Sequence, residues 1–273
     1  MRKTIEFLAV VAIVWCLFGV AILLFQGSGT VGSKPSISAP QDVLEVSVKD
    51  KEDVLLEDVT AEDAEDGNLN TSVFVESISP FDEEQCRTVT YAVFDSDDNL
   101  SQTTRQIKYK DYEVPKIVLK KALVFTYSNP DVELSDYVEA SSTVDGDISA
   151  AVTILTEEDS LTGNSNYVTI QVTDSCGVTS KLRLKVDFLD YEPVIDIQLT
   201  NYLIYVKKGT KIDAKEYIDT VIERQIEDPS LINSIEIQDN YNAKQPGVYE
   251  FIYRIERSNG DSGLTKLVVV VEE

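Results

Sequence analysis

The chain has 273 residues, of which 48 are acidic and 24 are basic, and its formal net charge is −24 at pH 7. This charge repels nucleic acid and anionic lipid surfaces, so both are excluded as partners. The chain has no histidine, which excludes Ser-His-Asp and Cys-His nucleophile activation and the usual zinc sites. No pair of carboxylates stands out by its spacing as an acid/base couple, and we therefore expect no enzymatic activity.

Residues 5–25 form a nearly uninterrupted apolar run, about as long as a helix needs to be to cross a bilayer. Arg2 and Lys3 precede the run, and the next basic residue is Lys34. Because basic residues favour the cytoplasmic side, residues 1–26 are predicted to be a cytoplasmic stub and a transmembrane helix. The sequence thus predicts a single-pass protein of the cell membrane, with a cytoplasmic N-terminus and extracellular C-terminal domains.

Two other interpretations of this run fit less well. A cleaved signal peptide has a shorter apolar region, of about 7 to 15 residues, although the small residues after Gln26 would allow cleavage. A lipoprotein signal at Cys16 would require a small residue where Trp15 stands. We therefore favour an uncleaved signal-anchor, with cleavage as the alternative. The chain ends directly after an apolar strand, so we expect no second anchor.

Residues 27–34 form a Gly/Ser-rich tether. After the tether, a Pro-x-Ile tripeptide recurs and divides the chain. This tripeptide begins at Pro35, Pro115 and Pro193. The spacing predicts domains at residues 35–113, 114–192 and 193–273. Since almost no linker residues remain between them, we expect a stiff row of domains.

The first two of these domains are copies of one unit. With an offset of 79 residues, the stretch from Val59 to Glu113 aligns with a later stretch of the chain without a gap. The matches are Val59-Thr-Ala-(x)4-Asp66-Gly67-Asn68-Leu69 with Val138-Glu-Ala-(x)4-Asp145-Gly146-Asp147-Ile148, and Val89-Thr-Tyr-Ala-Val-Phe-Asp95-Ser96 with Val168-Thr-Ile-Gln-Val-Thr-Asp174-Ser175. A fixed period of this size indicates one folding unit in tandem.

Apolar and polar residues alternate within each domain, for example from Val168 to Val172 and from Tyr249 to Tyr253. This is the pattern of half-buried strands. Turn residues interrupt the runs every 8 to 12 residues or so, as in antiparallel β-sandwiches. We predict an all-β chain of three tandem Ig-like antiparallel β-sandwiches after one N-terminal transmembrane α-helix. The third domain diverges, because Gln225-Ile-Glu-Asp-Pro-Ser230 replaces the Asp-Gly turn.

The Asp-Gly turn, the Val-Thr-x-x-Val-x-Asp-Ser strand and the Pro-x-Ile start together resemble bacterial surface Ig-like repeats. These are domains of unknown function in Gram-positive envelope proteins, similar to accessory domains of crystal toxins and loosely similar to hyalin-type repeats. The resemblance covers residues 35–192 well and 193–273 weakly. It implies a fold and a cell-surface location, and it implies no catalytic residues.

The Asp66-Gly67 and Asp145-Gly146 turns have two interpretations. In the first, Gly adopts positive φ and the Asp carboxylate closes the turn. In the second, the turn meets the loop before the last strand and their oxygens bind Ca²⁺. The calcium ligands would then be Asp63, Asp66, Asp95, Asp97 and Asp98, with Glu62 and Glu65 beside them, in the first domain, and Asp145, Asp147 and Asp174 in the second. We favour the first interpretation, and we expect no other cofactor.

Cys86 and Cys176 are not equivalent in the repeat, but both are expected at loops that flank the sixth strand of a domain. A disulfide between them would lock the first joint. The oxidising side of a membrane allows one, provided that the two Cα atoms lie within about 7 Å. Two thiols without a bridge are the favoured alternative.

The third domain is rich in tyrosines that could stack on a sugar: Tyr202, Tyr205, Tyr241, Tyr249 and Tyr253. Most of them have the phase of core residues in strands, so core packing is the favoured interpretation. A carbohydrate site would lie in this domain.

These features predict a non-catalytic, membrane-anchored extracellular stalk or binding protein, which projects an adhesive, protein-binding surface from a bacterial cell envelope. The sequence does not identify the partner, a protein or a cell-wall glycan. One alternative is a structural subunit of a membrane-associated envelope complex, which would expose a contiguous apolar patch on one sandwich face. The other is a carbohydrate- or calcium-dependent adhesin.

Overall fold

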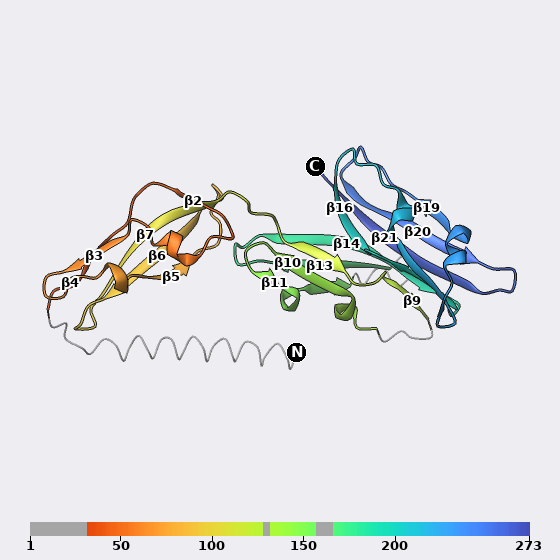
Figure 1. Ribbon diagram of the computed structural model, residues 1–273, viewed down its shortest axis with the longest axis horizontal. Coiled ribbons are helices and arrows are strands. Elements are labelled where there is room, and N and C mark those ends of the chain that lie inside the picture. Colours follow the sequence, from red (N-terminus) through yellow and green to blue (C-terminus); the bar gives the residue numbers. More distant parts are fainter. Residues whose placement is uncertain (1–31, 128–131, 157–165) are drawn as a thin grey trace. The chain divides into compact units, whose positions relative to one another are not determined.

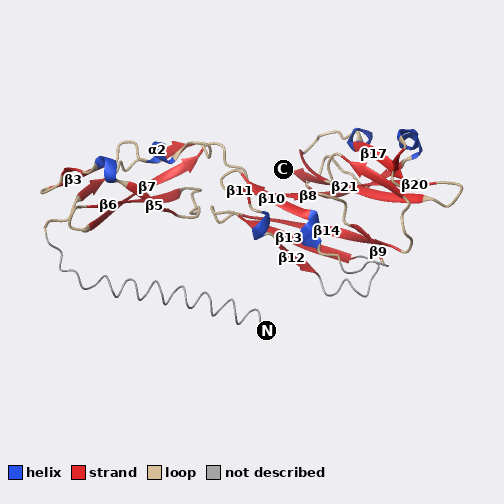
Figure 2. Cartoon of the chain, turned by 60° about the horizontal axis from the view of Figure 1, so that its bottom comes forward, coloured by secondary structure: helices blue, strands red, loops and turns tan. Residues whose placement is uncertain are grey.

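The computed structural model describes residues 32–127, 132–156 and 166–273 (Figure 1). The predicted transmembrane segment at residues 5–25 lies outside these ranges. Within them, no helix is both long enough and apolar enough to span a membrane. Strands make up most of the described chain and the helices are short (Figure 2). The strands form six sheets in pairs, so the chain contains three tandem β-sandwiches, and the all-β prediction is confirmed.

The first sandwich pairs a three-stranded sheet with a four-stranded one. The smaller sheet has the order β1-β3-β4 and the larger has the order β2-β7-β6-β5. The bounds are β1 Ser36–Ser38, β2 Leu44–Val46, β3 Thr60–Asp63, β4 Gly67–Asn68, β5 Phe74–Ile78, β6 Arg87–Phe94 and β7 Leu100–Tyr109, with the helical turns α2 Glu52–Leu55 and η1 Asn70–Ser72.

The second sandwich repeats this arrangement, with sheets β11-β10-β8 and β12-β13-β14-β9. Strand β9 runs parallel to β14, whereas the other pairings are antiparallel. The bounds are β8 Lys116–Leu119, β9 Val124–Thr126, β10 Val138–Ser142, β11 Gly146–Asp147, β12 Thr153–Thr156, β13 Asn166–Thr173 and β14 Thr179–Leu189, with η2 Leu134–Tyr137 and η3 Ser149–Ala151.

The third sandwich has sheets β15-β17-β18 and β16-β21-β20-β19, again with one parallel pair, β16 and β21. The bounds are β15 Ile195–Leu199, β16 Leu203–Lys207, β17 Ile218–Glu223, β18 Ile226–Glu227, β19 Glu236–Asp239, β20 Gly247–Glu256 and β21 Ser262–Glu272, with η5 Ala214–Tyr217 and η6 Pro229–Ser234. The sequence divergence of this domain therefore leaves its sheet order unchanged.

The alternating pattern places every second residue in the core. Val89, Tyr91 and Val93 of β6 are fully buried. The buried Tyr91 hydroxyl donates to the Leu55 carbonyl at the end of α2, and Tyr253 donates in the same way to Ala214 in the third sandwich, both at 2.7 Å. Burial raises the pKa of both phenols. The Leu55 carbonyl lies at the C-terminal end of α2, where a helix leaves carbonyls without an internal partner, and the Tyr91 hydroxyl satisfies it.

The chain forms two compact units. The first holds nearly all of the first sandwich, and the second holds the second and third sandwiches together with residues 47–49 and 80–84. Within the second unit, Leu203 and Val268 of the third sandwich join the hydrophobic core cluster of the second sandwich. The second and third sandwiches thus share a packed apolar seam.

A buried lysine closes this seam. The Lys266 side chain is 1% exposed, and its Nζ donates to the Lys185 carbonyl, to Asp187 Oδ2 and to Glu250 Oε1 at 2.6, 2.7 and 2.8 Å. Nearby, the Tyr205 hydroxyl contacts both the backbone N–H and the carbonyl of Ile117, each at 3.1 Å. All three donor positions of the ammonium group are used, so its charge is compensated inside the seam.

Candidate functional site

In the first and second sandwiches, the turn with the repeated Asp-Gly pair contacts the loop before the last strand of the same sandwich. In the first sandwich, Asp66 Oδ2 accepts from the Ser96 backbone N–H at 2.7 Å. In the second, Asp145 Oδ2 accepts from the Ser175 backbone N–H at 2.8 Å. These four residues are related by the 79-residue offset. The structure therefore brings together the two loops that the sequence analysis expected to meet.

In the first sandwich, other carboxylates accept backbone hydrogen bonds within their own loops. Asp63 Oδ1 accepts from the N–H groups of Glu65 and Asp66, and Asp95 Oδ1 accepts from those of Asp97 and Asn99. The backbone N–H groups of Asp66 and Glu65 lower the pKa of the Asp63 carboxyl. Asp98 adopts a positive φ of 62° in the same loop.

The end of the tether lies against this cluster. Ser33 Oγ donates to Glu65 Oε2 at 2.7 Å and approaches Asp63 Oδ2 at 3.4 Å. Gly32 has a φ of 86°, and a Cβ there would lie 2.6 Å from Asp97 Oδ2. The acidic end of the first sandwich thus holds the chain where it enters the domain.

The second sandwich uses a different residue for one of these roles. Ser142, at the position of Asp63, accepts the N–H groups of Val144 and Asp145 with its Oγ. Asp147 accepts from the Ser149 hydroxyl and N–H, which lower the pKa of its carboxyl. Asp174 is buried and accepts from the Val178 N–H and the Tyr112 hydroxyl.

These contacts support the turn-closing interpretation of the acidic residues. In the described residues, no group of three or more His, Cys, Asp or Glu side chains is arranged to hold a metal ion. Calcium binding at Asp63, Asp66, Asp95, Asp97 and Asp98, or at Asp145, Asp147 and Asp174, stays a prediction.

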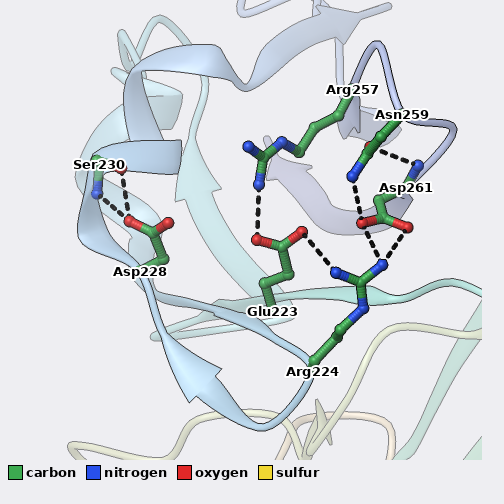
Figure 3. A network of polar contacts seen from close by, with 7 residues as sticks. All are labelled: Glu223, Arg224, Asp228, Ser230, Arg257, Asn259 and Asp261. Carbon is green, nitrogen blue, oxygen red and sulfur yellow. Dashed lines mark hydrogen bonds and ion pairs between the residues drawn. The ribbon is translucent and has the colours of Figure 1, made fainter.

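The third sandwich ties the same turn to the same loop with an ion pair (Figure 3). Its β17–β18 turn consists of Arg224 and Gln225, both with positive φ, at 49° and 70°. The Arg224 Nη2 atom donates to both carboxylate oxygens of Asp261, at 2.9 and 2.7 Å. Asp261 is the third-sandwich equivalent of Asn99 and Val178. In each sandwich, the backbone carbonyl of this residue accepts a hydrogen bond from the N–H of the residue four positions earlier.

Three more residues extend this network (Figure 3). Arg257 Nη1 donates to Glu223 Oε2 at 2.6 Å, and Glu223 Oε1 lies 3.9 Å from Arg224 Nη1. Asn259 Nδ2 donates to Asp261 Oδ2 at 2.8 Å. Nearby, the Asp228 carboxylate caps η6 by accepting from the Ser230 N–H. The charges of Arg224 and Arg257 balance those of Glu223 and Asp261, and together these side chains hold the loops of the third sandwich.

Cys86 lies directly before β6 and Cys176 lies in the β13–β14 loop, as the sequence analysis expected. Both side chains are buried. The Cys176 carbonyl accepts from the Phe81 N–H at 2.8 Å within the second compact unit. Cys86 belongs to the first unit, and the choice between a disulfide and two thiols without a bridge stays a matter of prediction.

The tyrosines considered for sugar binding have structural roles. Tyr253 is buried, and Tyr202 packs against both core clusters of the second unit. Burial raises the pKa of Tyr205, which lies in the seam, to about 12. Tyr241 and Tyr249 stack edge to face, and their hydroxyls donate to the carbonyls of Thr210 and Gln245.

An exposed group of apolar side chains lies on the outer surface of the β2-β7-β6-β5 sheet. Phe74, Phe94 and Leu100 are 39%, 46% and 36% exposed. The two phenylalanine rings stack with centroids 6.1 Å apart and planes 14° apart. Ala92 pairs with Phe74 and is fully buried, and Phe94 pairs with Leu100. We call Phe74, Ala92, Phe94 and Leu100 the apolar face.

Sequence reasoning did not single out the apolar face, although one signal was present. Strand β6 ends in four consecutive apolar residues, Tyr91 to Phe94, and the last two of these are Val93 and Phe94. Since neighbouring residues of a strand point to opposite sides of the sheet, one of the two had to point away from the core.

No family model matches the chain, and no curated protein matches it. Among solved structures, the CBM51-2 domain in complex with GlcNAc and the INT domains of ZmpB from Clostridium perfringens are 24% identical, with 55% of this chain and 26% of that one covered and a TM-score of 0.23. The Protocadherin GammaB4 extracellular domain is 12% identical, with coverages of 89% and 50% and a TM-score of 0.22. Drosophila N-cadherin EC1-4 is 12% identical, with coverages of 74% and 66% and a TM-score of 0.22. The chain thus spans about a quarter of the first of these chains and half of the second, and the likenesses assign no family.

Proposed function

We propose that the chain is a non-catalytic binding protein of a bacterial cell exterior. In this proposal the apolar run at residues 5–25 anchors it as a membrane helix, and tandem Ig-like sandwiches carry a protein-binding surface away from the bilayer. The position of Arg2 and Lys3 before the run supports the orientation. The resemblance of residues 35–192 to surface Ig-like repeats supports the location.

One observation carries the non-catalytic part of this proposal. The polar side chains at the loop ends hold the loops of their own sandwich, through Asp66 in the first, Asp145 in the second and Arg224 in the third. Side chains with these partners are engaged in holding the loops, which favours a structural role for them over an acid/base pair. The loops therefore serve the stability of the sandwiches, and binding falls to the surfaces of the sheets.

Cysteine labelling in intact cells tests the location. We expect a membrane-impermeant maleimide to label a Lys208→Cys variant in intact cells and a Thr4→Cys variant only after lysis. The unsubstituted chain supplies the background signal. Labelling of both variants in intact cells, or of neither, would overturn the predicted orientation.

The apolar face favours a second candidate function, that of a structural subunit in a membrane-associated envelope complex. Such a subunit needs a contiguous apolar surface on one sandwich, and Phe74, Phe94 and Leu100 provide one. Copurification of the full chain with other membrane proteins, and loss of that copurification when the apolar face is made polar, would distinguish this role from that of an isolated stalk.

A further inference from the structure

The three sandwiches offer an internal comparison for the apolar face. The strand pairings assign four equivalent positions in each sandwich. The first has Phe74, Ala92, Phe94 and Leu100, the second has Thr153, Gln171, Thr173 and Thr179, and the third has Glu236, Arg254, Glu256 and Ser262. The fold itself thus accepts polar residues at all four positions, so it does not require the phenylalanines.

In the second sandwich, these positions carry polar side chains, and two of them hydrogen-bond to each other. The hydroxyls of Thr173 and Thr179 hydrogen-bond to each other at 2.7 Å, at the positions where Phe94 and Leu100 lie in the first. Threonine is a good strand former that leaves the outer side of the sheet hydrated. Three exposed apolar side chains in one group, at a place where a hydrated alternative exists, indicate an interaction surface.

The outer surface of the corresponding sheet is already used for packing elsewhere in the chain. In the third sandwich, Val268 of β21 lies in the core cluster of the second sandwich, and Val270 packs against that cluster. A four-stranded sheet of this protein therefore buries apolar residues of its outer side when a partner is present. In the first sandwich, the corresponding sheet exposes the apolar face instead.

The net negative charge of the first domain indicates which side chains a partner should carry. Residues 35–113 contain 20 acidic and 6 basic residues. Face-to-face association of two copies would bring two strongly negative domains together, which is unfavourable. A partner with basic side chains around its apolar ones would instead gain from both contacts.

We propose that Phe74, Phe94 and Leu100, the exposed members of the apolar face, form a docking surface for a protein segment that presents apolar side chains flanked by lysine or arginine. This inference deepens the proposed function and depends on it, because it assumes that the chain acts by binding a protein. The stacked phenylalanine rings supply the apolar contact, and the acidic domain around them selects the basic flanks.

The test replaces the three exposed residues of the apolar face with the threonines of the second sandwich. A full-length variant that combines Phe74→Thr, Phe94→Thr and Leu100→Thr keeps the charge of the domain and uses side chains that the same fold already holds at these positions. We expect its thermal unfolding midpoint to stay within a few degrees of that of the unsubstituted chain. The matched control is Leu155→Thr on β12 of the second sandwich, which also removes an exposed apolar side chain.

The probes are two labelled peptides with identical leucine and phenylalanine positions, one with lysine and the other with glutamate between them. We expect the lysine peptide to bind the full chain and to bind the triple variant at least about tenfold more weakly, with Leu155→Thr unchanged. The glutamate peptide should bind neither protein. Equal binding of the lysine peptide to the triple variant, or no binding to the unsubstituted chain, would overturn the proposal.

Sedimentation of the full chain in detergent tests whether a second copy of the chain binds the apolar face instead. We expect the same monomeric mass for the unsubstituted chain and the triple variant. Self-association that the triple variant abolishes would assign the apolar face to a second copy and contradict the proposed partner. The outcome of cysteine labelling is independent of these measurements, so a failure of the docking surface is distinguishable from a failure of the proposed function.

Discussion

At the scale of single residues, all three sandwiches connect the same turn to the same loop, but they do so with different side chains. Asp66 and Asp145 accept a backbone N–H across the gap, whereas Arg224 reaches across it to the carboxylate of Asp261. The arginine sits in a left-handed conformation that disfavours side chains with a Cβ, by roughly 1–2 kcal/mol. The ion pair and the contact with Glu223 stabilise a turn that the backbone alone would not prefer.

The first prediction concerns Asp261. Its replacement by alanine removes both oxygens that Arg224 contacts and the acceptor of Asn259. Because Arg224 is largely exposed, we expect a loss of only about 1–2 kcal/mol in the free energy of unfolding. Urea unfolding followed by circular dichroism measures it. Asp219→Ala, an exposed acidic residue of β17, is the control and should change little. An Asp261→Ala protein as stable as the control would show that the tie is dispensable.

The residue scale also shows where sequence reasoning reaches its limit. The Ig-like topology predicted that the turns of Asp66 and Asp145 would meet the loop before the last strand, because both loops lie at the same end of such a sandwich. Arg224 and Gln225 carry no such signal, since neither is a residue type that favours positive φ. The long-range Asp261 contact that holds them is not visible in the local sequence.

At the scale of elements, alternation predicted the strands, and the repeat predicted that two sandwiches would share one pattern of hydrogen bonds. The Leu69 N–H donates to Ala61 just as the Ile148 N–H donates to Ala140, both at 2.9 Å. What alternation cannot indicate is which outward surface is covered. The apolar run from Leu267 to Val271 has the composition of a strand buried on both sides. In the structure, one side of this run lies in the core of the third sandwich and the other side packs against the core of the second.

The second prediction compares glycines in two kinds of environment. Gly67 and Gly146 share a φ of 72° in equivalent hairpins, and nothing lies within 4 Å of a Cβ at either position. Gly67→Ala and Gly146→Ala should therefore cost similar amounts, about 1 kcal/mol each, from backbone strain alone. A Cβ at Gly263 would instead lie 2.2 Å from the Ile195 carbonyl oxygen.

Gly263→Ala should thus cost clearly more than either hairpin variant, because β15 must move away from β21. Urea unfolding of the three variants in parallel gives the comparison. If Gly263→Ala were no more destabilising than Gly67→Ala, the close approach of β15 to β21 would not limit the packing of the third sandwich.

At the scale of the whole molecule, the second and third sandwiches behave as one packed unit through a seam with a charged centre. Burial alone would raise the pKa of the Asp187 carboxyl, but the charges and hydrogen bonds of Lys266 and Lys185 outweigh it and hold that pKa below its ordinary value of 3.8. Asp187 is therefore ionised when folded, and the seam depends on that charge.

The third prediction is the resulting pH dependence. A carboxyl whose folded pKa lies below its unfolded value adds stability above the unfolded pKa and loses it as the pH falls through the folded pKa. The contribution of Asp187 should thus be complete at neutral pH and disappear below about pH 3.8. Asp187→Asn should flatten the acid limb of stability against pH in urea unfolding. Asp190→Asn, an exposed neighbour, should leave the limb as steep as before.

The fourth prediction concerns Lys266, which is 1% exposed and neutralises Asp187 and Glu250 at once. Lys266→Met removes the cation that pairs with Glu250, while Asp187 keeps its ion pair with Lys185, so we expect a loss of about 3–5 kcal/mol in the free energy of unfolding. Circular dichroism in urea should then show the second and third sandwiches unfolding in separate steps. Adding Glu250→Gln to Lys266→Met removes the uncompensated charge and should restore most of the stability, because Lys185 still pairs with Asp187 and the apolar contacts of Leu203 and Val268 remain. If Lys266→Met unfolded in one step at the original midpoint, apolar packing alone would hold the two sandwiches together.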